Sequence, residues 1–167
     1  MKYVLPLAIA LASTPAFADQ NTSSQGLKGR MYAGASLSHN EIDSPFGGGD
    51  ADAAGYSLFA GLDLKNSVEG LATSAEIGYS DTEDFYKGNG DTDINGFWLA
   101  GVLEKSLPEI DQRLTALGRI GLDFGDDDGI FLGAGIGFRA TQALDLRAEF
   151  INKDASGLYQ VSALVRF

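Results

Sequence analysis

The sequence contains no cysteine and only four prolines among its 167 residues. Disulfide bonds are therefore excluded, and an exported domain of this length must be held together by its fold or by its solvent. Beyond the N-terminal segment, no stretch reaches the roughly 18 apolar residues that a transmembrane helix needs. If the chain enters a membrane, it must do so as a closed β-barrel, because only a closed barrel pairs all its strand backbone groups.

Basic residues are also scarce. Twelve lysines and arginines face 23 aspartates and glutamates, so the formal net charge is −11. A nucleic-acid-binding function is excluded on this ground, because nucleic acid phosphates attract basic surfaces. Glycine, in contrast, is abundant with 22 residues and shows neither a collagen period nor a linker run. This composition favours strands and turns.

The N-terminus has the layout of a secretory signal peptide. Met1-Lys2 gives a short basic start, a mostly apolar run follows, and Ala16-Phe17-Ala18 places small residues where a signal peptidase cleaves. We therefore predict a signal peptide over residues 1–18 and a short periplasmic segment over 19–28. Residues 29–167 are predicted to form one barrel domain.

Apolar and polar residues alternate with period two along the remaining chain, which is the pattern of half-buried β-strands. We predict eight strands of about 9–11 residues, the length that crosses a bilayer at a tilt. They are expected over residues 30–38, 56–65, 73–80, 94–104, 114–124, 130–139, 144–151 and 159–167. The facing of the strand at 94–104 stays open, because Phe97-Trp98-Leu99 is apolar on both faces.

Alternation alone does not separate a soluble β-sandwich, apolar inside, from a membrane barrel, apolar outside. The polar faces favour the barrel, because they carry opposite charges near mid-strand and many small residues, which suits a narrow lumen. The prediction is an all-β, eight-stranded antiparallel up-and-down transmembrane β-barrel, with a soluble periplasmic β-sandwich as the alternative. The expected lumen charge network consists of Asp63, Glu76, Arg119, Arg139, Arg147, Glu149 and Arg166.

The connections between the predicted strands differ in length and charge. With both termini in the periplasm, the junctions at 39–53, 81–93, 125–129 and 152–157 face outside, where longer loops are expected. The first three of these regions hold acidic residues that account for nearly the whole net charge of −11. We interpret them as a hydrated acidic surface. Oxygen ligands at this density could also hold Ca²⁺ or Mg²⁺, including ions that bridge lipopolysaccharide phosphates.

One acidic segment resembles half of a calcium-binding loop. Asp91, Asp93 and Asn95, followed by Gly96, fit the first half of an EF-hand loop, but Val102 stands where the bidentate glutamate belongs. These three residues are a weak calcium candidate, and we predict no metal site and no cofactor.

Taken together, the strand pattern, the run Gly133-Ala134-Gly135-Ile136-Gly137-Phe138-Arg139, the strand from Leu144 to Phe150 and the terminal Phe167 resemble the OmpA-like, opacity-type outer membrane β-barrel family. The resemblance implies a cleaved, exported, monomeric protein of the outer membrane, in contact with lipid and lipopolysaccharide. It also implies that the barrel assembly machinery reads the last strand. The residues that carry this assembly signal are Tyr159, Val161, Ala163, Val165 and Phe167.

The predicted function is structural: the barrel anchors in the outer membrane and presents acidic loops to a host or phage surface ligand. A small-solute or ion channel is the alternative, although eight strands leave an interior just wide enough for side chains. A lipid A-modifying enzyme is a further alternative, because some outer membrane barrels use a His/Ser/Glu set. The candidates are His39, Ser36, Ser38 and Glu41. Adjacent strand residues face opposite ways, so Ser38 and His39 do not converge, and we predict no enzyme.

Overall fold

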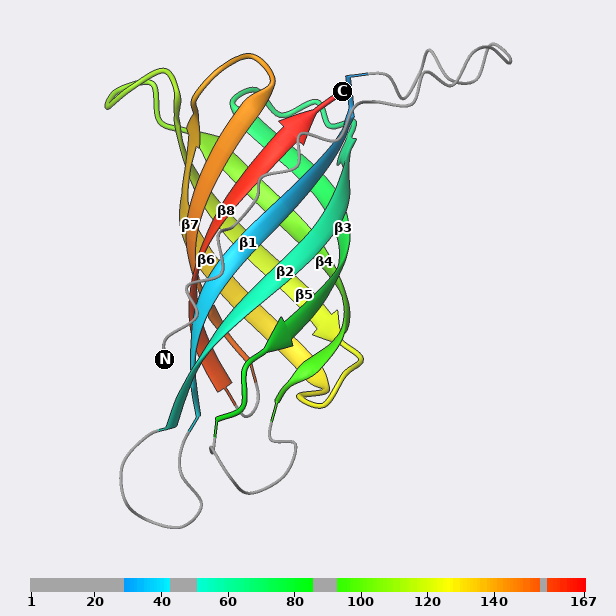
Figure 1. Cartoon of the computed structure of the whole chain (residues 1–167). Coiled ribbons are helices and arrows are strands. Elements are labelled where there is room, and N and C mark those ends of the chain that lie inside the picture. The colour runs from blue at the N-terminus through cyan, green and yellow to red at the C-terminus, as the bar shows by residue number, and fades with distance from the viewer. Residues whose placement is uncertain (1–28, 43–50, 86–92, 154–155) are drawn as a thin grey trace.

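A computed structural model describes residues 29–42, 51–85, 93–153 and 156–167. Its strands close into one antiparallel barrel in which each strand pairs with its chain neighbours and β1 pairs with β8 (Figure 1). The strands are β1 (Met31–Ile42), β2 (Ala51–Leu64), β3 (Leu71–Thr82), β4 (Asn95–Ser106), β5 (Leu114–Asp123), β6 (Gly129–Arg139), β7 (Leu144–Asn152) and β8 (Ser156–Arg166). The predicted signal peptide, 1–18, and the segment 19–28 lie outside the described residues. Within the described part of the chain, no helix is long and apolar enough to cross a membrane.

The two faces of the barrel wall differ as the membrane interpretation predicts. Leu37, Ile77 and Val161 point outward with 58–63% of their surface exposed, whereas Ser36, Glu76 and Ser162 point inward and are at most 4% exposed. A soluble sandwich would bury the apolar set instead. The eight-stranded, apolar-out barrel is thereby confirmed, and the sandwich alternative is wrong.

The structure settles which way the strand around Trp98 faces. Trp98 points inward at 7% exposure, while Phe97 and Leu99 point outward at 63% and 48%. Trp98 lies directly opposite Gly78 of β3 in the register, and this glycine leaves room for the indole inside the barrel. The sequence pattern left this choice open because both faces are apolar there.

Several strands run further than the 9–11 residues predicted. β1, β3 and β4 each have 12 residues and β2 has 14. The extra residues of β1 and β2 pair with each other, Glu41 opposite Asp52, and both side chains are exposed. Ladder hydrogen bonds therefore continue past the apolar belt into a charged hairpin end.

The two ends of the barrel are built differently. One end, called the turn end, has the connections 65–70, 107–113 and 140–143 and the C-terminus (Figure 1). The opposite end, called the loop end, has the described connecting residues 83–85, 93–94, 124–128 and 153. At the turn end, the backbone and side chain of Arg113 donate to the Asp111 carboxylate at 2.8–3.3 Å. These hydrogen bonds, the side-chain ones most of all, lower the pKa of Asp111 and fix the turn.

Candidate functional site

The middle of the lumen is filled by a group of charged side chains, called here the central ion cluster: Glu76, Glu104, Arg119, Arg147 and Glu149. Arg119 Nη1 forms an ion pair with Glu76 Oε2 at 2.8 Å, and its Nε donates to Glu149 Oε1 at 2.8 Å. Arg147 donates to Glu76 and to Glu104, at 2.5 Å in each case. The side chains of Glu76, Arg119, Arg147 and Glu149 are at most 2% exposed. Strands β3, β4, β5 and β7 are thus joined across the interior.

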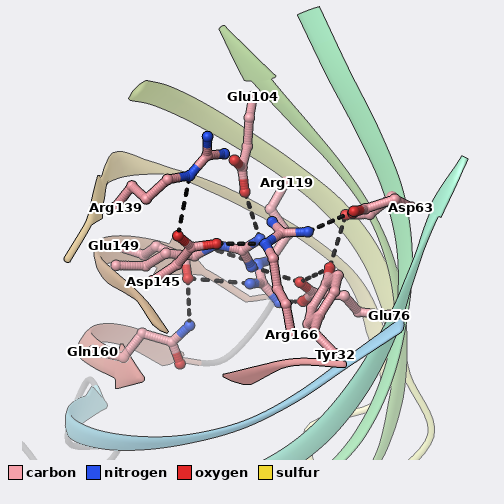
Figure 2. A network of polar contacts seen from close by, with 12 residues as sticks. Tyr32, Asp63, Glu76, Glu104, Arg119, Arg139, Asp145, Glu149, Gln160 and Arg166 are labelled. Atoms are coloured by element: carbon pink, nitrogen blue, oxygen red, sulfur yellow. Dashed lines mark hydrogen bonds and ion pairs between the residues drawn. The ribbon is translucent and has the colours of Figure 1, made fainter. Parts of the chain in front are cut away.

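Two neutral side chains complete this cluster. The Tyr32 hydroxyl donates to Glu76 Oε1 at 2.6 Å and lies 2.9 Å from Ser74 Oγ, and Gln160 Nε2 donates to Glu149 Oε2 at 3.0 Å (Figure 2). Buried charges lose their hydration, and only good geometry with additional hydrogen bonds offsets that loss. Tyr32 and Gln160 supply such bonds from β1 and β8.

A second set of ion pairs lies nearer the turn end. Arg166 bridges Asp63 Oδ2 at 2.5 Å and Asp145 Oδ2 at 2.6 Å (Figure 2). Arg139 Nε approaches Asp145 at 3.6 Å, but its side chain is 61% exposed. Arg139 is the last residue of β6, so its side chain lies at the mouth and not in the closed interior where the sequence prediction placed it.

On the loop-end side of the central ion cluster lies a layer of aromatic rings. Phe59 and Trp98 have ring centroids 5.9 Å apart, and Trp98 and Phe131 pack edge to face at 6.3 Å. Ile151 and Leu158 are buried in the same hydrophobic cluster. The lumen is therefore closed by an apolar layer as well as by ion pairs.

Each inward aromatic ring lies opposite a glycine on the neighbouring strand. A Cβ built on any of these glycines would lie 2.2–2.4 Å from the facing ring. The register pairs are Tyr32–Gly61, Phe59–Gly34, Trp98–Gly78 and Phe131–Gly121. Large and small residues thus alternate across the strands, which allows bulky rings into a narrow barrel.

Sequence reasoning missed Glu104 and the aromatic layer. Glu104 was missed because the facing of 94–104 was open; once Trp98 is placed inward, Glu104, six residues later, must share its face. Phe59 and Phe131 share their strand faces with glycine and polar residues, so local alternation gives no reason to group them; their glycine partners are visible only once the strand register is known.

The calcium candidate is only partly within the described chain. Asn95 Nδ2 donates to Asp93 Oδ2 at 3.1 Å, whereas Asp91 lies outside the described residues. In the described ranges, no group of three or more potential ligands from His, Cys, Asp and Glu is gathered.

The barrel wall separates the two candidate serines from His39 and Glu41. His39 points outward with its side chain 53% exposed and its Nε2 3.6 Å from Glu41 Oε1. Ser36 points inward, as does Ser38, which lines the lumen at the loop end. The outward neighbours of His39 on the paired strands are Ala54 and Tyr159, neither of them serine.

Charge is distributed unequally between the ends. Within the described loop-end connections, the only lysine or arginine is Lys153, whose Nζ lies 2.6 Å from Asp123 Oδ2 with 11% of the side chain exposed. Acidic residues at this end are exposed, among them Asp52, Glu83, Asp126 and Asp128. Basic residues gather at the other end: Arg30, Lys65, Lys105, Arg113, Arg139 and Arg166.

A closed antiparallel barrel with an apolar exterior and a charged interior is a transmembrane β-barrel, the class found in outer membranes. The sequence matches the outer membrane protein beta-barrel domain over residues 4–160, and the chain belongs to this family. Its place is accordingly the outer membrane. Comparison with curated proteins finds no match.

Solved structures show the same fold. A de novo designed transmembrane β-barrel superposes with a TM-score of 0.57 at 13% identity, covering 84% of this chain and 97% of the other. Neisserial surface protein A gives 0.56 at 16% identity, covering 82% and 97%. Ail, the attachment invasion locus protein of Yersinia pestis, gives 0.57 at 12% identity in its complex with the heparin analogue sucrose octasulfate, covering 84% and 99%. At these identities the likeness establishes the fold and no more.

Proposed function

We propose that this protein is a structural and interaction protein of the outer membrane. The barrel anchors the chain, and the acidic loop end faces outside and binds cationic partners. The observation that carries the proposal is the combination of a lumen closed by buried ion pairs with a loop end where Lys153 is the only described lysine or arginine of the connections. A closed interior leaves the surface as the place of function.

The charge of the loop end decides which partner class fits. Sucrose octasulfate, found on Ail, is a polyanion. Exposed carboxylates such as Glu83 and Asp128 would repel a polyanion and attract cations. The proposed partners are therefore divalent cations that bridge lipopolysaccharide phosphates, or basic patches on a host or phage protein.

Two further proposals concern the barrel wall. The signal that the assembly machinery reads would be the outward set Tyr159, Val161, Ala163, Val165 and Phe167. The first four are exposed on β8, and Phe167 is exposed directly after it, which supports this role. We also propose that the protein is monomeric and not an enzyme, a view supported by the separation of Ser38 from His39.

A cationic probe tests the proposal. Folded protein in phospholipid nanodiscs should bind a lysine-rich peptide, with affinity falling as salt rises because exposed charges are screened. The double variant Glu83→Gln/Asp128→Asn should bind several-fold more weakly. The matched control, Glu69→Gln/Glu109→Gln, removes the same charge from exposed positions at the turn end and should bind as wild type. Equal losses in both variants, or no binding at all, would contradict the proposal.

A further inference from the structure

The connection between β5 and β6 is held in place on two sides. On one side it lies against β4: Asp126 N donates to the Asn95 carbonyl oxygen at 3.0 Å, and Asn95 N donates to Asp126 Oδ2 at 3.1 Å. A Cβ added to Gly125 would lie 2.1 Å from that carbonyl oxygen, so the two backbones are in close contact. On the other side, the connection is held by side chains at the two ends of the β7–β8 connection. These side chains can therefore be changed while the backbone contact with β4 stays.

Two side-chain contacts form this second side, and we call them the loop-end latch. Lys153 Nζ lies 2.6 Å from Asp123 Oδ2, and Ser156 Oγ donates to Asp127 Oδ2 at 2.5 Å. The side chains of Asp123 and Lys153 are 4% and 11% exposed, and Asp127 and Ser156 are each 6% exposed as whole residues. Because both contacts are buried, salt screens them only weakly. The latch therefore joins the β5–β6 connection firmly to the β7–β8 connection.

The latch buries half of the carboxylates of this segment. Of the four aspartates at the end of β5 and directly after it, only Asp126 and Asp128 are exposed. Asp123 and Asp127 are buried and bonded within the latch. Lys153 places an ammonium group of the protein itself against Asp123, where a cationic group of a partner would otherwise bind. In the latched state the acidic surface thus has two carboxylates fewer to offer.

We propose that the loop-end latch is an autoinhibitory contact, in which Lys153 and Ser156 compete with a polycationic partner for Asp123 and Asp127. The inference rests on the function proposed above, because the partner is one that binds the acidic surface. Such a partner gains two more carboxylates when the latch opens, but both contacts must first break. The apparent affinity falls as the fraction of unlatched molecules falls. Weakening the latch should therefore tighten binding.

A substitution that leaves the net charge unchanged separates the latch from general electrostatics. Ser156→Ala removes the hydroxyl that donates to Asp127, so it should bind the lysine-rich peptide in phospholipid nanodiscs about two- to three-fold more tightly than wild type. Ser162→Ala is the matched control on the same strand, because Ser162 is also buried but its Oγ bonds to no group of the described chain. This control should bind as wild type. Circular dichroism first shows that both variants are folded.

Hydrogen exchange reports opening of the latch without any peptide. The backbone amides of residues 124–128 should exchange faster in Ser156→Ala than in wild type. Lys153→Met leaves Asp123 buried without its cation and should speed this exchange further, whereas Lys105→Met, at the turn end, should leave it unchanged.

The outcomes separate the two proposals. Equal peptide binding by wild type and Ser156→Ala overturns the autoinhibitory role and leaves the acidic surface as the binding site, and so do equal exchange rates in these two proteins. An absence of peptide binding by wild type and by both latch variants overturns the proposed function together with the latch.

Discussion

At the scale of single residues, the central ion cluster is where a substitution is expected to change the stability of the barrel most. Glu76 receives hydrogen bonds from Tyr32 and Arg147 and an ion pair from Arg119, and its side chain is fully buried. A buried charge that loses its partner keeps the cost of dehydration without the compensating attraction. One carboxylate therefore stabilises two arginines at once.

Replacing this carboxylate is the sharpest test. Glu76→Gln should lower the free energy of unfolding by about 3–5 kcal/mol, because two buried guanidinium groups lose a counter-charge. Asp63→Asn, at a pair where the carboxylate side chain is 31% exposed, should have a much smaller effect. Urea unfolding in lipid vesicles measures both. Similar losses in the two variants would show that burial does not determine the contribution of these pairs.

At the scale of strands, the interior is organised by glycine–aromatic pairs across neighbouring strands. The backbone carbonyl of Leu58 also lies close to Gly78, so a side chain there meets both a ring and a backbone group. The pairs fix which residues stand opposite one another and hence the register of β1–β2, β3–β4 and β5–β6.

Gly78→Ala should destabilise the barrel by about 1–3 kcal/mol, because the added methyl would lie 2.4 Å from the Trp98 ring and the packed interior resists expansion. Gly101→Ala is the control on the adjacent strand, since its added Cβ has no neighbour nearer than 4.0 Å. Unfolding midpoints in urea compare the two. A neutral result at position 78 would show that the indole has space to move aside.

The outward face of β8 gives a second test at this scale. Val161→Arg should cost about 2–4 kcal/mol, the penalty for a charge near the bilayer midplane. Val165→Arg, close to the end of the same strand, should cost far less, because the long side chain reaches water. Folding yields into phospholipid vesicles report the difference. Equal yields for both variants would place the apolar belt at another height on the barrel.

Strand identity and facing could be predicted from sequence because period two is a local property. In β7, Leu146 and Phe150 alternate with Arg147 and Glu149. The structure places the first two on the outer face and the last two in the lumen, as predicted. Strand ends were less predictable. β2 begins at Ala51, ahead of the expected position 56, because pairing with β1 extends the strand over residues 51–55, where apolar and polar residues do not alternate clearly. Cross-barrel contacts such as Glu76 with Arg147 depend on register, which no local pattern specifies.

For the whole molecule, the layered interior predicts that the barrel conducts no ions across the membrane. Purified barrels inserted into planar bilayers should give no stepwise conductance, because the central ion cluster and the layer of Phe59, Trp98 and Phe131 fill the cross-section. A known open porin in the same bilayer serves as the positive control. Regular, voltage-independent steps from this protein would support the small-solute channel instead.

The seam between β1 and β8 has a consequence for how such a chain reaches its final state. The first and last strands are paired along Tyr32–Ile42 and Ser156–Arg166, and Phe167 N bonds to the Met31 carbonyl at 3.1 Å. The barrel is thus closed by pairing its first strand with its last. A shorter piece of the chain would have two edge strands whose backbone groups have no hydrogen-bond partners in the bilayer. A chain that ends before residue 156 lacks β8 and leaves β1 and β7 as unpaired edges. Insertion of the barrel into the membrane therefore requires the whole set of eight strands.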